Sequence, residues 1–138
     1  MKRIIFFLIL SSFFSCNRDI SDADLQKLNG YWEIETAVLP DGNKKDYTVN
    51  STIDYFQLKD GKGFRKKVMP QVDGTYRMND VQESIAVSRA DGKTFINYTT
   101  PYAKWKEQVL EIDDEHLVVK NPQDLEYHYK KPQPFSVK

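Results

Sequence analysis

The chain has 138 residues, with 20 basic and 20 acidic side chains, so its formal net charge at pH 7 is zero. That length suits a single domain. Because there is no basic excess to neutralise phosphates, the composition argues against nucleic acid as a partner.

The amino-terminal segment has the pattern of an export signal. Two basic residues precede an apolar run from Ile4 to Leu10, and a short stretch of serine and phenylalanine leads to Cys16. A positive start, a short apolar stretch and a small residue (Ser15) before a cleavage point are typical of bacterial export signals. A membrane-crossing helix would need about 20 apolar residues. We therefore expect residues 1–15 to be a signal peptide.

Cys16 is the only cysteine of the chain, and its position directly after the leader resembles a lipobox. In such lipoproteins the signal is removed before the cysteine, which then carries fatty acyl chains such as palmitate. The resemblance implies a lipid anchor on Cys16 in the bacterial cell envelope, and we expect it at the outer membrane. A secretory signal with an accidental cysteine is the alternative. One cysteine allows no intramolecular disulfide.

A polar tether and a short helix are expected next. Residues 16–24, which begin with the lipidated cysteine, show no apolar periodicity. Ser21 or Asp22 is suited to cap one or two helical turns through Leu25 and Leu28.

The rest of the mature chain consists of short strand-like runs separated by turn signals. Four Asp-Gly dipeptides accept the positive φ angles of tight hairpin turns. The expected strands are Tyr31–Val38, Thr52–Lys59, Gly63–Met69, Thr75–Met78, Val81–Arg89, Thr94–Thr99, Lys104–Ile112, His116–Lys120 and Leu125–Lys131. Strands at roughly ten-residue intervals joined by hairpins indicate an antiparallel meander.

Period-two alternation gives most of these strands one apolar face. Trp32 and Ile34, for example, alternate with Glu33 and Glu35. One apolar face per strand is what a barrel requires, and closure removes exposed strand edges. We predict an all-β fold over residues 25–131, an up-and-down meander closing into a barrel of 8–9 strands after the helical turn. Residues 132–138 form a carboxy-terminal tail.

The segment Leu28-Asn29-Gly30-Tyr31-Trp32-Glu33-Ile34 resembles the opening of a lipocalin-like domain. That family begins with a short helical turn, followed by Gly-x-Trp at the start of the first strand. Together with the leader, the resemblance is to small lipocalin-like lipoproteins of Bacteroidota-type bacteria. It implies that Gly30 and Trp32 close one end of the barrel, with a basic residue of the last strand over the indole. Lys130, or its neighbour Lys131, is the nearest match.

No catalytic or metal-binding motif accompanies this fold. His116 and His128 lie beside Glu115 and Glu126, but single histidines on solvent faces are common, and we predict no metal site and no cofactor. Asp113-Asp114 is read as a tight turn. Because no nucleophile and base converge in the sequence, we expect a binding protein and not an enzyme.

The candidate ligand contacts lie in a proline loop. Tyr102 and Trp105 flank it, and either residue would touch a ligand at a barrel mouth, although Trp105 is equally suited to the core. The inward face can line a cavity for a small apolar or amphipathic molecule, or fill one. In the second case the chain is a filled-barrel interaction module for another envelope protein. The basic hairpin at 59–67 is then a candidate surface, or else an edge kept soluble by lysines.

Overall fold

The computed structural model describes residues 20–48, 50 and 52–132, and for Asn79 only the backbone. The expected signal peptide, the anchor Cys16, the first residues of the tether and the tail from residue 133 lie outside the described residues.

A short helix, α1 (Asp22–Gln26), precedes the strands. Ser21 is its cap: the Asp24 N–H donates to Ser21 Oγ at 3.1 Å, and the Ser21 N–H donates to Asp24 Oδ2 at 3.2 Å. This reciprocal capping box satisfies two amide groups that the helix would otherwise leave unpaired. Leu25 is buried, so the helix is held by its apolar side.

Within the described residues the remaining chain forms nine strands in one antiparallel sheet. Their bounds are β1 (Gly30–Val38), β2 (Lys44–Asp46), β3 (Ile53–Lys59), β4 (Lys62–Pro70), β5 (Tyr76–Ala90), β6 (Lys93–Thr99), β7 (Lys104–Ile112), β8 (His116–Lys120) and β9 (Glu126–Lys130).

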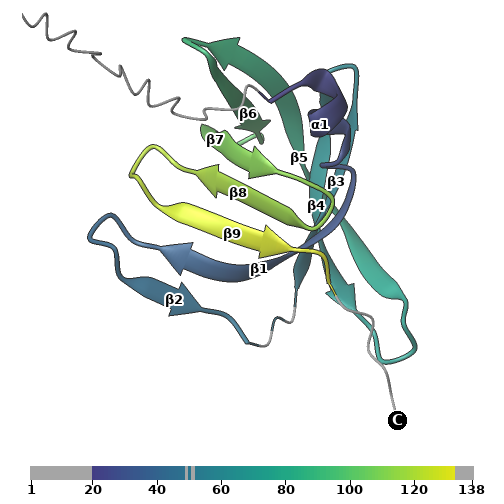
Figure 1. The fold of residues 1–138 in the computed structure, drawn as a ribbon. Helices are drawn as coiled ribbons and strands as arrows, with labels where there is room; N and C mark the ends of the chain where they lie inside the picture. Colours follow the sequence, from purple (N-terminus) through teal and green to yellow (C-terminus); the bar gives the residue numbers. More distant parts are fainter. Residues whose placement is uncertain (1–19, 49, 51, 133–138) are drawn as a thin grey trace, which may run out of the picture.

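The sheet closes because β1 pairs on both of its edges. Its first residues pair with β3, its last residues pair with β2, and β9 runs along it from Glu33 to Val38. The strands β1 and β3–β9 therefore form a closed eight-stranded barrel, with β2 as an addition outside it (Figure 1). The predicted all-β meander is confirmed.

Two features differ from the predicted strands. The runs expected at 75–78 and 81–89 form one continuous strand, β5, whose partner β4 has a register shift between Lys66 and Val68. Such an irregularity bends the ladder without ending it. The strand β2 was not predicted, because its Lys-Lys-Asp sequence is fully exposed and has no apolar alternation.

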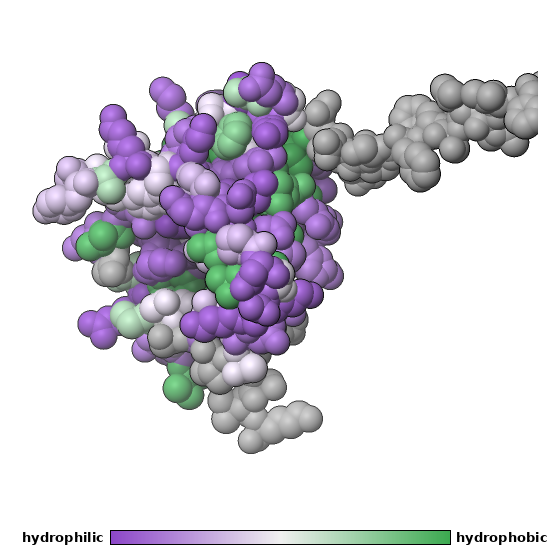
Figure 2. Space-filling model, turned by 90° about the vertical axis from the view of Figure 1, so that its left-hand side faces the viewer, coloured by the Kyte–Doolittle hydropathy of each residue, from purple (hydrophilic) through white to green (hydrophobic). Residues whose placement is uncertain are grey.

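The two ends of the barrel differ. At one end, called here the closed end, α1 packs beside the β3–β4 turn, and Asp22 forms an ion pair with Arg89 at 2.8 Å. Antiparallel connectivity places the β1–β2, β4–β5, β6–β7 and β8–β9 turns at the opposite end, called the far end. The β1–β2 and β8–β9 hairpins point away from α1 (Figure 1). Figure 2 faces them and shows a mainly hydrophilic surface on which hydrophobic residues form small separate patches.

The apolar core runs through the barrel, from Leu28 at the closed end to Tyr98 and Val119 near the far ends of β6 and β8. Leu28, Trp32, Ile96 and Leu117 have no exposed surface. Period-two alternation in the sequence predicts Tyr76, Phe95 and Leu110 on the inner face, but all three lie outside: Tyr76 stacks on Tyr31 at 4.1 Å, Lys106 lies over Phe95, and Leu110 is 36% exposed. For Leu110 the cause is the register shift between Val109 and Glu111, which reverses the alternation.

Candidate functional site

Charged side chains lie inside the barrel among residues of the apolar core, and Arg65 contacts the Phe56 and Tyr98 rings. Alternation along β3, β4, β5 and β7 directs them inward, since they share faces with buried apolar residues such as Phe56, Ile85 and Val109. We call this group the interior polar cluster; its members are Asp54, Arg65, Lys67, Glu83 and Glu107.

Arg65 is the centre of the interior polar cluster. Its Nε donates to Glu83 Oε2 at 2.8 Å, and its Nη2 forms an ion pair with the same carboxylate. The guanidinium carbon lies 4.3 Å from the Tyr98 ring centroid, and the side chain is only 11% exposed. Burial alone would lower the pKa of Arg65, but Tyr98, Asp54 and Glu83 outweigh that effect and raise it, so Arg65 keeps its charge.

Within the described ranges, Asp54 and Glu107 each have a buried oxygen without a hydrogen bond, but Glu107 lies farther from the nearest cation. Its side chain is 8% exposed, and among the described residues no hydrogen bond reaches Oε1. Arg65 Nη1 lies 3.9 Å from that oxygen, which is an ion-pair distance beyond hydrogen-bond range. Burial raises the pKa of Glu107, although Tyr98 and Arg65 partly oppose the shift. The barrel thus holds a desolvated carboxylate with spare acceptor capacity.

The other acid–base pair lies nearer the far end. Lys67 Nζ is 2.5 Å from Asp54 Oδ1; the Asp54 side chain is 3% exposed and that of Lys67 is 54% exposed. Lys67 therefore reaches inward from solvent to neutralise a buried carboxylate. Strand pairing aligns these residues directly, because Asp54 lies opposite Lys67 in the β3–β4 ladder.

Aromatic rings enclose the interior polar cluster. Tyr98 and Trp105, opposite each other on β6 and β7, stack with centroids 5.3 Å apart and planes inclined by 10°. Burial raises the pKa of Tyr98 well above its ordinary value, with Glu107 adding to the shift, and burial and Asp54 do the same for Tyr129. Both hydroxyls therefore stay protonated at neutral pH and can donate hydrogen bonds.

The structure separates the two residues expected to contact a ligand. Trp105 is half-buried and packs on Tyr98 inside the barrel, two residues along β7 from Glu107. Tyr102 lies in the β6–β7 turn and is 96% exposed. Trp105 thus adjoins the interior polar cluster, whereas the ring of Tyr102 lies in solvent at the far end.

The closed end has the arrangement expected around Trp32, with one change of residue. Trp32 is fully buried and its Nε1 donates to the Leu28 carbonyl at 2.9 Å. The cation over its ring is Lys131, with Nζ 3.9 Å from the centroid, and not Lys130. Lys130 pairs in the ladder with Glu33 and His116, on strands β1 and β8.

Gly30 opens β1 beneath this contact. Its φ is +119°, a conformation that side-chain-bearing residues rarely adopt, and an added Cβ would lie 3.4 Å from Lys131 Nζ. Burial lowers the pKa of Lys131, partly countered by Asp114.

The basic stretch at 59–67 does not form one surface. Along β4, Arg65 and Lys67 turn inward to their acidic partners, whereas Lys62 and Lys66 lie on the other face, Lys66 over the Phe64 ring. Strand alternation divides the cationic run between the two faces. Arg65 and Lys67 therefore belong to the interior polar cluster and not to a basic surface.

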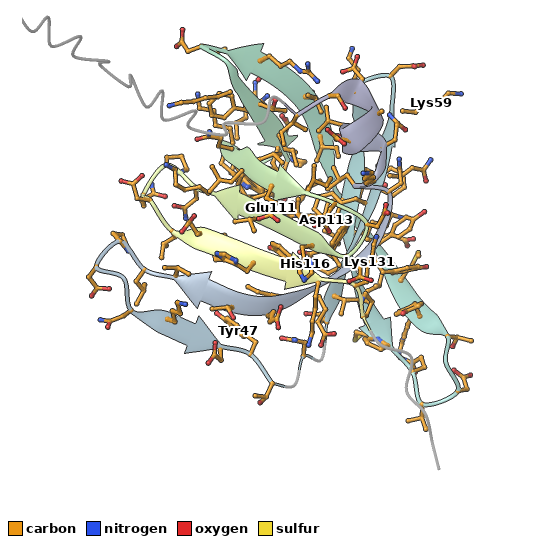
Figure 3. All side chains as sticks on the ribbon, viewed as in Figure 1. Tyr47, Lys59, Glu111, Asp113, His116 and Lys131 are labelled. Carbon is orange, nitrogen blue, oxygen red and sulfur yellow. The ribbon has the colours of Figure 1, made fainter. Side chains whose placement is uncertain are left out.

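The histidines and the acidic turn remain separate from the interior polar cluster. Asp113 Oδ1 accepts from the Glu115 and His116 amides and lies 3.4 Å from His116 Nδ1, which makes it a turn-forming residue. Figure 3 shows Asp113 and His116 at the β7–β8 turn, close to Lys131. Over the described part of the chain, no group of three or more metal-ligating side chains forms.

Sequence reasoning missed the interior polar cluster, although the signal was present. Arg65 shares a strand face with Gly63, Glu83 with Ile85, and Glu107 with Val109, so a strict count of alternation places three charges inside. Because the strands carry many other charged residues on their outer faces, the inward position of these three did not stand out in the sequence. The cross-strand partners also depend on register, which turn signals alone do not determine.

A closed up-and-down barrel with a short helix at one end and a Gly-x-Trp at the start of its first strand is the architecture of a lipocalin-like domain. The chain belongs to the lipocalin-like domain family, which it matches over residues 28–119. Members of that family are generally binding proteins and not enzymes.

Several solved structures are similar to this chain at low sequence identity. A lipocalin-like protein from Bacteroides uniformis is 14% identical, with a TM-score of 0.48, covering 77% of this chain and 99% of its own. An uncharacterized protein from Bacteroides eggerthii is also 14% identical, with a TM-score of 0.47 and coverages of 76% and 99%. Apocrustacyanin C1 is 8% identical, with a TM-score of 0.48 and coverages of 84% and 67%. A search of curated proteins found no significant match.

No helix within the described ranges is both long and apolar enough to span a membrane.

Proposed function

We propose that this chain is an envelope-anchored binding protein that holds a small amphipathic molecule inside its barrel. The observation that carries the proposal is the interior polar cluster with its unpartnered Glu107 Oε1. It lies near Trp105, which is half-buried and offers apolar surface to the rest of a ligand.

A barrel that serves only as a packed scaffold has no need of such a group. Replacing buried ion pairs by apolar residues of similar volume is often neutral or stabilising, and a buried acceptor without a donor costs about 1–3 kcal/mol. A ligand with a donor group would recover that energy, and burial of its apolar part would add roughly 25 cal/mol per Å². The unsatisfied acceptor destabilises the empty barrel, and a ligand that donates to it binds more tightly for that reason.

Native mass spectrometry of the full chain, purified from a bacterium that processes lipoproteins, tests the proposal. We expect a reproducible bound mass beyond that of the acylated protein, and its loss in the Trp105→Ala variant. Tyr102→Ala tests the second predicted contact, and the exposure of that ring leads us to expect a smaller effect. A protein free of bound mass that also fails to bind the neutral probe N-phenyl-1-naphthylamine would contradict the proposal.

A second candidate is an interaction module for another envelope protein. Exposed apolar side chains on the β4–β5 hairpin favour it, namely Met69, Val72 and Met78. Met69→Ser/Val72→Ser would weaken partner capture and leave a barrel ligand in place. If this double variant instead lost the ligand and still bound the partner, the β4–β5 hairpin would not be the partner-binding surface, and the result would argue against the interaction module.

The lipid anchor on Cys16 is part of the same proposal and rests on the leader sequence. Cells fed an alkyne-tagged palmitate should label the wild-type chain and not the Cys16→Ala variant, and the label should fractionate with outer membranes. Equal labelling of the two chains would rule out Cys16 as the acylated residue.

A further inference from the structure

The interior polar cluster carries an excess of negative charge. Asp54 is neutralised by Lys67, and Glu83 receives two contacts from Arg65. Glu107 then remains as a third carboxylate without a cation of its own. A buried charge that lacks a partner is unfavourable, and its pKa shifts toward the neutral form, as the raised pKa of Glu107 shows.

Arg65 does not serve as that partner. Its hydrogen bond goes to Glu83 and its cationic face lies over Tyr98, which leaves Nη1 at 3.9 Å from Glu107 Oε1. An anionic ligand would therefore meet an arginine already engaged by Glu83, with two carboxylates close by. A ligand that brings a hydrogen-bond donor would meet an open acceptor.

The aromatic residues next to Glu107 suit a cation as well. Trp105 lies two residues before Glu107 on β7 and directly opposite Tyr98 on β6. The face of an indole ring attracts cations, and Trp105 presents such a ring close to Glu107. A carboxylate beside aromatic faces is the combination that recognises a protonated amine.

We propose that the barrel binds an amphipathic molecule with a protonated amino group, which donates to Glu107 Oε1 while the apolar body packs against Trp105. This inference rests on the proposed function and adds the chemical class of the ligand. Binding of the amine brings the interior polar cluster to zero net charge, because three acids then face two basic side chains and one ligand cation.

Three small probes with one body and different head groups test the inference: 4-phenylbutylamine, 4-phenylbutanol and 4-phenylbutanoate. The full chain is reconstituted in lipid nanodiscs, and each probe is titrated by calorimetry at pH 7 against empty nanodiscs. We expect the amine to bind about tenfold more tightly than the alcohol, the equivalent of about 1.4 kcal/mol, and the carboxylate to bind more weakly still.

Two variants locate the effect. Glu107→Gln keeps the size of the side chain and removes its charge, so the ratio of amine to alcohol affinity should fall to about one. Glu111→Gln is the matched control, because Glu111 is an exposed residue of the same strand (Figure 3). It should leave the ratio unchanged. Far-ultraviolet circular dichroism establishes that both variants are folded.

The possible failures are distinct. If 4-phenylbutanoate binds as tightly as the amine or more tightly, the amine inference is overturned while the binding function stands. If the wild-type preference persists in Glu107→Gln, Glu107 is not the recognising group and the assignment fails. If no probe of the series binds and N-phenyl-1-naphthylamine does not either, the proposed function fails together with the inference.

Discussion

Arg65 is the residue on which the order of the barrel interior depends, because it forms an ion pair with the half-buried Glu83 and lies 3.9 Å from the buried Glu107. Arg65→Met would leave Glu83 without its ion-pair partner and would remove the guanidinium nearest to Glu107. Breaking a buried ion pair from one side is expected to cost about 3–5 kcal/mol of unfolding free energy. Urea denaturation measures it, with the exposed Lys62→Met of the same strand as control. Equal stability of the two variants would mean that Arg65 is not a structural partner.

Glu107 makes stability depend on pH in a defined direction. Burial raises its pKa above the ordinary value of 4.5, despite Arg65 and Tyr98, while Asp54 and Glu83 add to the shift. The folded state then holds this proton more tightly than the unfolded chain does. Its destabilising contribution is therefore absent below pH 4.5 and complete above the raised pKa, so stability falls as pH rises through that window.

Glu107→Gln removes that titration. Relative to the wild type, the variant should gain stability between pH 4.5 and 7.5, by about 1.4 kcal/mol per unit of pKa difference between the folded and unfolded states. Urea denaturation of both proteins across this range measures the difference. A stability difference that does not change with pH would show that Glu107 titrates as it does in the unfolded chain.

The contact between Lys131 and Trp32 provides a residue-scale test of the closed end. Lys131→Ala removes the cation 3.9 Å above the buried indole and should cost about 1 kcal/mol. Lys130→Ala, its neighbour in sequence, should cost less, since Lys130 lies away from the ring. Thermal unfolding shows which of the two variants is less stable. A larger loss of stability for Lys130→Ala would contradict the assignment of Lys131 to the indole contact.

At the scale of elements, the β3–β4 hairpin depends on a glycine that no turn requires. A Cβ on Gly63 would lie 1.7 Å from the Gln57 carbonyl oxygen, a backbone atom that cannot move aside freely. Gly63→Ala should therefore destabilise the barrel by about 3 kcal/mol or more, at the upper end of overpacking effects. Lys59→Ala in the same hairpin is the exposed control, and chemical denaturation distinguishes them. A tolerated alanine would imply that β3 and β4 separate easily at this position.

At the scale of the molecule, barrel closure by β1 and β9 predicts a hierarchy of hydrogen exchange. The ladder between β1 and β9 is part of the closed ring, whereas β2 pairs only with β1 and is exposed throughout. Amides of β9 should exchange through global unfolding, and those of Lys44–Asp46 through local opening. Exchange of β9 as fast as that of β2 would mean that the barrel opens along this seam.

Much of the barrel could be predicted from local signals. Asp60-Gly61 and Asp91-Gly92 have both φ values positive, as two-residue hairpin turns demand, and the strands on either side begin and end at these dipeptides. The closed end could also be predicted from Gly30 and Trp32, because their roles follow from residue type and from their position at the start of the first strand.

The site was predicted only in part, because it depends on register. Trp105 was recognised as a candidate from its chemistry, and its strand position places it beside Glu107. Neither the side on which Tyr102 projects nor the choice between Lys130 and Lys131 follows from local sequence. Both depend on where strands end and on which residue first leaves the ladder.

Turn dipeptides, capping residues and period-two alternation thus specify an all-β meander, its turns and its capped helix. Each of these signals involves residues within a few positions of one another. The pairing of Arg65 with Glu83, the approach of Lys67 to Asp54 and the unpartnered oxygen of Glu107 exist only once the barrel has closed. They join strands through a register that bulges shift by single residues. Because one such shift reverses every inward face, the chemistry of the interior is a property of the folded barrel and not of any segment.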